Sequence, residues 1–223
     1  MSFGTMLQEL TGGMWESIKI FFLTLLFALP LGLVVCAGRL SKHAWLKYLV
    51  SFLISVLRGT PLMLQLLVVY FFPYYLFGWS ISGWRYPAII VGFSINYAAY
   101  FAEIYRSGIE AIPKGQWEAA EILGYTKQQI FFRVIFPQML HIVLPSLTNE
   151  IITLVKDTSL AFSLSYMEMF TLAKQIAASN TTFMPFVISA IFYYVFNLLV
   201  TFVMGRLEKK MNYDKKSGKG GRA

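Results

Sequence analysis

Long apolar stretches dominate this sequence and constrain its fold more than any other feature. They cover about residues 18–37, 48–77, 86–105, 139–164 and 183–205. A helix needs about 20 mainly apolar residues to cross a bilayer. The chain is 57% hydrophobic and only 13% charged, whereas a soluble domain is about a quarter charged. The sequence therefore predicts an all-α membrane protein with about five transmembrane helices in a single domain, residues 1–210.

Lysine and arginine residues are concentrated on one side of the predicted membrane. That side receives the basic segments 39–47, 106–133 and 206–222, while the other side has only Lys19, Arg85 and Lys174. Short loops rich in these residues stay in the cytoplasm. We therefore expect the N-terminus outside, without a cleaved signal peptide, and the C-terminus in the cytoplasm. We expect the basic tail, residues 211–223, to be disordered and to act as an orienting anchor rather than a nucleic-acid site.

The longest polar insert between two apolar stretches, residues 112–138, predicts two short helices joined by a tight corner. Pro113 suits the first turn of a helix, and Gly124 stands where a helix end favours a left-handed residue. Thr126 and Gln129 have the spacing of a capping box, which starts a second helix expected to end before Pro137. On shape alone, the insert is equally typical of a surface helical hairpin in a cytoplasmic loop.

Four short motifs occur along the chain in a fixed order. They are Arg58-Gly59-Thr60-Pro61, then Ala102-Glu103-Ile104, then Ile112-Pro113-Lys114-Gly115-Gln116-Trp117-Glu118-Ala119-Ala120, and last Lys156-Asp157-Thr158-Ser159-Leu160. In order and spacing they resemble the polar amino acid uptake permeases of bacterial ABC importers, in which Glu118-Ala119-Ala120 with Gly124 corresponds to the EAA signature. The resemblance covers about residues 15–210.

This resemblance implies a type I importer transmembrane domain that takes up a polar amino acid by alternating access across the bacterial cytoplasmic membrane. The implied partners are cytoplasmic ATP-binding-cassette ATPase subunits, a second permease subunit, identical or homologous, and an extracellular or periplasmic amino-acid-binding protein. ATP and Mg²⁺ would be held by the ATPase, and this chain would need no cofactor. Coupling to the ATPase would use Trp117, Glu118, Ala119, Ala120 and Gly124. The particular amino acid stays open.

Polar side chains inside the predicted spans form three clusters, and such residues mark functional sites by default. In the second span, Arg58, Pro61 and Gln65 are spaced to share a helical face beside a predicted break at Gly59–Pro61. The fourth span is expected to break at Pro145. The other two clusters are Asn96, Tyr100 and Glu103 in the third span, and Asn149, Thr153 and Asp157 with flanking Glu150 and Lys156 in the fourth. Together they predict a polar cavity near the membrane midplane, with hydrogen bonding between helices as the alternative for Asn96 and Tyr100.

A zwitterionic amino acid needs hydrogen-bond donors for its carboxylate and acceptors for its ammonium group. Thr60 and the N–H groups freed by the helix break suit the carboxylate, and Glu150 suits the ammonium. The predicted substrate-binding residues are Thr60, Gln65, Asn96, Tyr100, Glu150, Asp157 and Ser159. We expect structural or gating roles for Arg58, Glu103 and Lys156, and structural pairing with another span is the alternative for Asp157.

Catalytic and metal-binding motifs are missing from the sequence. His43 and His141 lack the spacing of metal ligands, and no G-x-x-x-x-G-K-[ST] phosphate-binding loop occurs. Gly92-Phe93-Ser94 does not continue into a nucleophile elbow, which disfavours an intramembrane hydrolase. We therefore interpret the chain as a transport subunit without its own ATPase. An ion-coupled secondary transporter of small polar solutes is the alternative, although it would not need the insert at residues 112–138.

Overall fold

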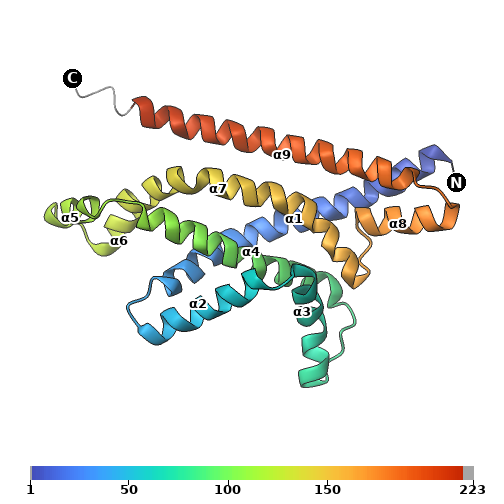
Figure 1. Cartoon of the computed structure of the whole chain (residues 1–223), viewed down its shortest axis with the longest axis horizontal. Helices are drawn as coiled ribbons and strands as arrows, with labels where there is room; N and C mark the ends of the chain where they lie inside the picture. Colours follow the sequence, from blue (N-terminus) through green and yellow to red (C-terminus); the bar gives the residue numbers. More distant parts are fainter. Residues whose placement is uncertain (1, 218–223) are drawn as a thin grey trace.

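The computed structural model is entirely helical over the residues that it describes, 2–217 (Figure 1). In chain order the helices are α1 (Phe3–Arg39), α2 (Ala44–Gly59), α3 (Leu62–Phe77), α4 (Arg85–Glu110), α5 (Lys114–Ile122), α6 (Lys127–Gln129), the π-helical η1 (Ile130–Ile135), α7 (Phe136–Asp157), the 3₁₀-helical η2 (Thr158–Leu164), α8 (Met169–Asn180) and α9 (Met184–Ser217). The predicted all-α class is confirmed. Of the predicted tail, residues 211–217 continue α9, and residues 218–223 lie outside the described part of the chain.

Four helical segments are long and apolar enough to cross a membrane, namely α1, α4, Lys127–Leu164 and Met184–Met211. The α2 and α3 helices pass the same test only as a pair, bent by 114° at the break between them. If this pair is one span, the number of spans is five, as the sequence predicted. The first helix begins at Phe3 rather than near residue 18, because Met6, Leu10 and Met14 bury one side of the extension against α8 and α9.

The α4 helix lies at the centre of the bundle, in contact with α1, α2, α3 and α7. Its packing against α1 and α7 depends on two glycines. A Cβ atom at Gly32 of α1 would lie 2.8 Å from the Phe101 Cβ, and one at Gly108 of α4 would collide with the Val143 side chain. Small residues of this kind let helix backbones approach closely in membranes. The central position of α4 brings its polar side chains into contact with all four of these helices.

The corner in the 112–138 insert forms as the sequence predicted. The α5 helix ends just before Gly124, whose φ of +77° lies in the left-handed region. Thr126 Oγ1 accepts a hydrogen bond from Gln129 N, and Gln129 Oε1 accepts one from Thr126 N, which completes the capping box. Both features are local, since each depends only on residues a few positions apart.

The prediction that the second helix of the insert ends before Pro137 is wrong. The helix runs without a break from Lys127 to Leu164, through both Pro137 and Pro145. A π-helical turn at Ile130–Ile135 precedes Pro137, with Phe136 N donating to Phe131 O five residues earlier. This wider turn relieves the clash that a proline ring makes with the preceding turn of an α-helix. The predicted break at Pro145 is also absent, because a spanning helix tolerates one missing backbone hydrogen bond when neighbouring helices support it.

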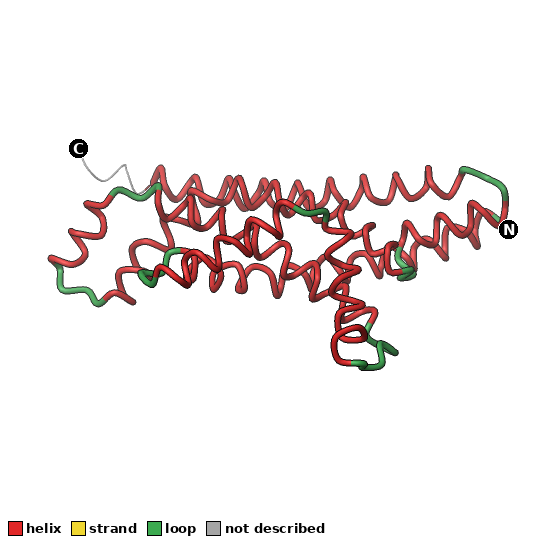
Figure 2. The backbone as a smooth tube through the Cα atoms, turned by 60° about the horizontal axis from the view of Figure 1, so that its bottom comes forward, coloured by secondary structure: helices red, strands yellow, loops and turns green. Residues whose placement is uncertain are grey.

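The two ends of the bundle differ in the segments that they carry. In Figure 1, α5, α6 and the far end of α9 lie at one end, and the N-terminus and α8 lie at the other. The turn between α1 and α2 lies toward the α5 end, and Figure 2 shows the same arrangement from another side. The lysine- and arginine-rich segments thus gather at one end of the molecule, as the charge pattern requires.

Candidate functional site

The break between α2 and α3 is held open by side chains from two helices. Pro61 disfavours a helical conformation at the residue before it, and Thr60 is extended, with φ −119° and ψ 150°. The break leaves carbonyl groups at the end of α2 without helical partners. Gln65 Nε2 donates to Leu57 O at 2.8 Å and to Thr60 O at 3.1 Å, and Asn96 Nδ2 donates to Leu57 O at 3.2 Å. The predicted shared helical face of Arg58, Pro61 and Gln65 does not exist, because the helix axis turns between them.

Three of the predicted substrate-binding residues therefore form one hydrogen-bonded cluster. Gln65 Nε2 also donates to Thr60 Oγ1 at 2.8 Å, and Asn96 Nδ2 donates to Gln65 Oε1 at 2.9 Å. Thr60 Oγ1 in turn donates to Val56 O at 2.8 Å. Asn96 is only 4% exposed. Their polar atoms are engaged in joining α2, α3 and α4, which is the interhelical role that the sequence left open for Asn96.

A second cluster, of charged and aromatic groups, lies beside this break. The Arg58 guanidinium is 5.1 Å from the centre of the Tyr100 ring, and the charges of Arg58 and Asp157 both act on Glu150. Glu150 is half-buried and makes no hydrogen bond or ion pair with any side chain that the structure describes. Arg58, on α2, thus has Tyr100 of α4 and Glu150 of α7 as neighbours, and the carboxylate of Glu150 remains available to a ligand.

The other predicted residues at the end of the fourth span are hydrogen-bonded within the protein or exposed. Asp157 Oδ2 accepts a 2.7 Å hydrogen bond from the hydroxyl of Tyr97, which is 2% exposed. Ser159 Oγ donates to Lys156 O at 2.8 Å, within its own helical turn. Lys156 is exposed and forms no ion pair among the described residues. Sequence reasoning missed Tyr97, because nothing in the sequence pairs a tyrosine on the third span with an acid sixty positions later.

A small polar hollow lies on the α5 side of the break, between α1, α2 and α4. Its volume is about 370 Å³, and it is lined by Arg39, Ser51, Ile54, Ser55, Arg58, Gly59 and Glu103. Arg106 binds Glu103 through Nε and Nη2, the latter at 2.8 Å. Arg39 Nε lies 3.4 Å from Glu103 Oε1. Glu103 and Arg58, both predicted to be structural or gating groups, thus line the same hollow.

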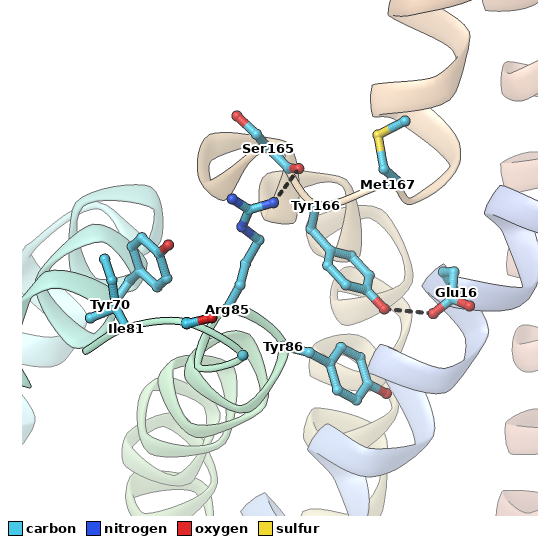
Figure 3. Close-up of a pocket in the computed structure, with 10 residues that line it drawn as sticks. Glu16, Tyr70, Ile81, Arg85, Tyr86, Ser165, Tyr166 and Met167 are labelled. Carbon is cyan, nitrogen blue, oxygen red and sulfur yellow. Dashed lines mark hydrogen bonds between the residues drawn. The ribbon is translucent and has the colours of Figure 1, made fainter. Parts of the chain in front are cut away.

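A larger hollow of about 710 Å³ opens at the other end of the bundle (Figure 3). Tyr166 donates a 2.6 Å hydrogen bond to Glu16, and Arg85 donates to Ser165 O at 3.4 Å. The Tyr86 ring stacks on the Tyr166 ring at 5.3 Å. Burial, together with the nearby Glu16 carboxylate, raises the pKa of Tyr166, so the tyrosine remains a proton donor. These contacts link α1 and α4 to the turn after η2, and sequence reasoning missed them because they join distant segments.

The predicted coupling residues lie together on α5 and its corner, but they do not all face outward. Glu118 and Ala119 are exposed, Trp117 is half-buried, and Ala120 is only 4% exposed because it packs into the bundle. The tip of α5 instead exposes two large apolar side chains, Ile122 and Leu123, at 85% and 73%. The surface that α5 offers to a partner therefore combines an acid, a small residue and an apolar tip.

Comparison with known proteins shows a match over most of the chain. Residues 28–213 match the family model described as "Binding-protein-dependent transport system inner membrane component". The chain is 35% identical over 206 residues to the L-cystine transport system permease protein TcyB of Bacillus subtilis (strain 168), covering 91% of this chain and 86% of that protein. It is 34% identical over 200 residues to the putative glutamine transport system permease protein GlnP of Rickettsia conorii (strain ATCC VR-613 / Malish 7), covering 89% and 91%.

A solved structure has the same fold. The crystal structure of an amino acid ABC transporter with histidines superposes with a TM-score of 0.82 at 30% sequence identity, covering 94% of this chain and 99% of that one. The chain belongs to the binding-protein-dependent transport system inner membrane component family. It is a multi-pass permease subunit of an ABC importer in the cytoplasmic membrane, and ATP hydrolysis is carried out by a separate subunit.

Proposed function

We propose that this permease imports a polar amino acid and that Glu150 binds the ammonium group of the solute. The class of solute is supported by the similarity of the chain to a cystine permease and a putative glutamine permease. The observation that carries the proposal is the Glu150 carboxylate, which is half-buried in a spanning helix and unpaired among the described side chains. An ionisable side chain inside the membrane is costly and is retained for function. A ligand ammonium would supply the missing partner.

Arg58 is the best placed group to receive the carboxylate of the same solute. Its guanidinium rests on the Tyr100 ring and acts electrostatically on Glu150. A guanidinium presents several N–H donors in a fork that matches a carboxylate, and Arg58 forms no ion pair with any described residue. Thr60, for which the sequence suggested this role, already donates its hydroxyl hydrogen to Val56 O. The proposed site thus joins α2 and α7 beside the break.

We infer where the partner subunits bind from the differences between the two ends of the bundle. We place the α5 end in the cytoplasm, where Glu118, Ala119 and the apolar tip of α5 would contact an ATP-binding-cassette ATPase. The opposite end would receive the solute from an amino-acid-binding protein outside the membrane. A second permease subunit, identical or homologous, would complete the pathway. Closure of the ATPases would then move α5 and, through the unbroken Lys127–Leu164 helix, the segment that carries Glu150.

The test is uptake by the reconstituted importer, with its ATPase and binding protein, using labelled L-cystine, L-glutamine and L-arginine in turn. Glu150→Gln keeps the size of the side chain and removes its charge. We expect the variant to lose most uptake while it still assembles with the ATPase. Glu9→Gln, a change of the same kind at an exposed position on α1, should transport normally.

Two results would contradict the proposal. Unchanged uptake by a fully inserted Glu150→Gln variant would move Glu150 to a structural role. Absence of uptake of all three amino acids by the wild-type importer would contradict the proposed class of solute.

A further inference from the structure

The hollow on the α5 side of the break has the chemistry of a second amino acid site. At about 370 Å³ its volume is at the lower end of the range for small-molecule sites. Its lining includes groups of both charges, namely Arg39 and Arg58 as cations and Glu103 as an anion. An α-amino acid carries a carboxylate and an ammonium group separated by one carbon, so it needs both charges in one small space.

One helical face leads into this hollow. Lys47, Ser51, Ser55 and Arg58 recur on α2 at spacings of four, four and three, which places them on one side of the helix. Ser51 and Ser55 line the hollow, and neither hydroxyl makes a hydrogen bond within the described part of the chain. The face runs from the α5 end of α2 up to Arg58 at the break. This face carries hydrogen-bonding groups, whereas the opposite side of α2 exposes large apolar residues.

Arg58 connects the hollow with the proposed Glu150 site. Its positive charge acts on Glu150 and also on Glu103. It lines the hollow, and its guanidinium lies against Tyr100. It is the next-to-last residue of α2, so the bend at the break lies directly beside it. A small change at this bend would move the guanidinium relative to both carboxylates.

The Arg39–Glu103 ion pair is suited to exchange with a zwitterion. Its atoms are 3.4 Å apart, and both side chains are partly exposed, at 23% and 16%. This contact is longer than the 2.8 Å contact between Glu103 and Arg106. Arg106 holds Glu103 separately through two nitrogens, so Glu103 keeps its position when Arg39 leaves. An incoming ammonium group can therefore take the place of Arg39 on Glu103, while the carboxylate of the same solute binds the released Arg39 together with Arg58.

We propose that the hollow between Arg58 and Glu103 is a second, inner binding station for the transported amino acid, occupied after the Glu150 site and before release. It recognises the charged α-carbon groups rather than the solute side chain, because the contacts described above involve only the two charges and the hydroxyls. This proposal rests on the proposed function.

The experiment measures protection of a cysteine placed in the hollow. Cys36 is the only cysteine of the chain and is 2% exposed, so Ser55→Cys introduces a single accessible thiol. The assembled importer, with its ATPase and without nucleotide, is treated in nanodiscs with a water-soluble methanethiosulfonate reagent. Labelling of this chain is followed by mass spectrometry with and without L-cystine, L-glutamine or L-arginine. Lys42→Cys, in the exposed turn between α1 and α2, is the matched control.

We expect the transported amino acid to slow labelling of Ser55→Cys several-fold and to leave Lys42→Cys unchanged. Combining Ser55→Cys with Arg39→Gln, which leaves the Glu103–Arg106 pair in place, should abolish this protection. Combining Ser55→Cys with Glu150→Gln should preserve it. Protection that is lost with Glu150→Gln and kept with Arg39→Gln would overturn the inner station in favour of the Glu150 site alone. Unprotected Ser55→Cys in an importer with normal uptake would also overturn it. Failure of the wild-type importer to take up any amino acid would instead overturn the proposed function.

Discussion

Glu168 joins three helices, α8, α9 and α1, through its carboxylate. It is fully buried at the start of α8 and accepts 2.8 Å hydrogen bonds from the backbone N–H groups of Phe170 and Thr171. It also accepts hydrogen bonds from Tyr193 of α9 and Ser17 of α1. Replacement by alanine would leave several buried donors without partners. We expect Glu168→Ala to lower the free energy of unfolding by about 2 kcal/mol, measurable as a lower thermal midpoint.

The same residue predicts a pH dependence. Burial raises the pKa of Glu168 above its ordinary value near 4.5, although four hydrogen bonds oppose the shift. The folded protein then holds the proton more tightly than the unfolded chain does. This stabilisation is complete below the unfolded pKa and is lost as the pH rises through the folded pKa. Relative to Glu168→Gln, the thermal midpoint of the wild-type protein should therefore decrease from pH 4.5 upward. A midpoint difference that does not change with pH would contradict this assignment.

Among the elements, we expect the α5–α6 corner to couple the permease to its ATPase. Force from a soluble ATPase must reach the spanning helices through a stiff connection, and the corner depends on the φ of +77° at Gly124. A β-branched residue adopts such a φ only with strain. We expect Gly124→Val to insert into the membrane but lose uptake, with ATPase subunits that bind weakly or hydrolyse ATP without transport.

Two control substitutions make this prediction specific. Gly124→Asn should keep most uptake, because asparagine tolerates the left-handed conformation. Gly115→Ala, inside α5 where an added Cβ meets no atom within 4 Å, should transport normally. Full uptake by a well-expressed Gly124→Val variant would show that residues 112–138 are not the coupling element.

The elements also show how far the sequence could predict this structure. The Gly124 corner and the Thr126–Gln129 capping box were predictable, because their causes lie within a few residues. The position of the break at Gly59–Pro61 was predictable for the same reason, but its angle of 114° was not. The carbonyls exposed at that break are bound by Gln65 and by Asn96 from another helix, a contact that only the packed bundle defines.

The candidate site was predictable to a similar extent. Sequence reasoning selected polar residues inside spans, and Thr60, Gln65 and Asn96 do meet in space. It could not distinguish polar atoms that satisfy each other from polar atoms left free for a ligand, since that depends on which neighbours each helix presents. Position inside a predicted span therefore gave Gln65 and Glu150 the same role, although only Gln65 of the two has hydrogen-bond partners among the described residues.

At the scale of the whole molecule, the last prediction concerns orientation in the membrane. The basic segments 39–47 and 106–133 and the described part of the basic tail, residues 206–217, belong to one end of the bundle, and the N-terminus and α8 lie at the other. The positive-inside rule then places the α5 end and the end of α9 in the cytoplasm. A reporter that is active only in the cytoplasm should work when fused after Ala223. A reporter that is active only after export should work when inserted at Ser80, in the exposed loop before α4.

Each reporter should be inactive at the other site, so that each site serves as the control for the other. With an odd number of spans, the N-terminus and the C-terminus lie on opposite sides of the membrane. The same reporter should then be active at one terminus and inactive at the other. If α2 and α3 did not together cross the membrane once, the chain would have four spans and both termini would lie on one side. Activity of an export-dependent reporter after Ala223 would therefore contradict the orientation. Matching activity of one reporter type at residue 2 and after Ala223 would show that the bent α2–α3 pair enters the membrane and returns on the same side.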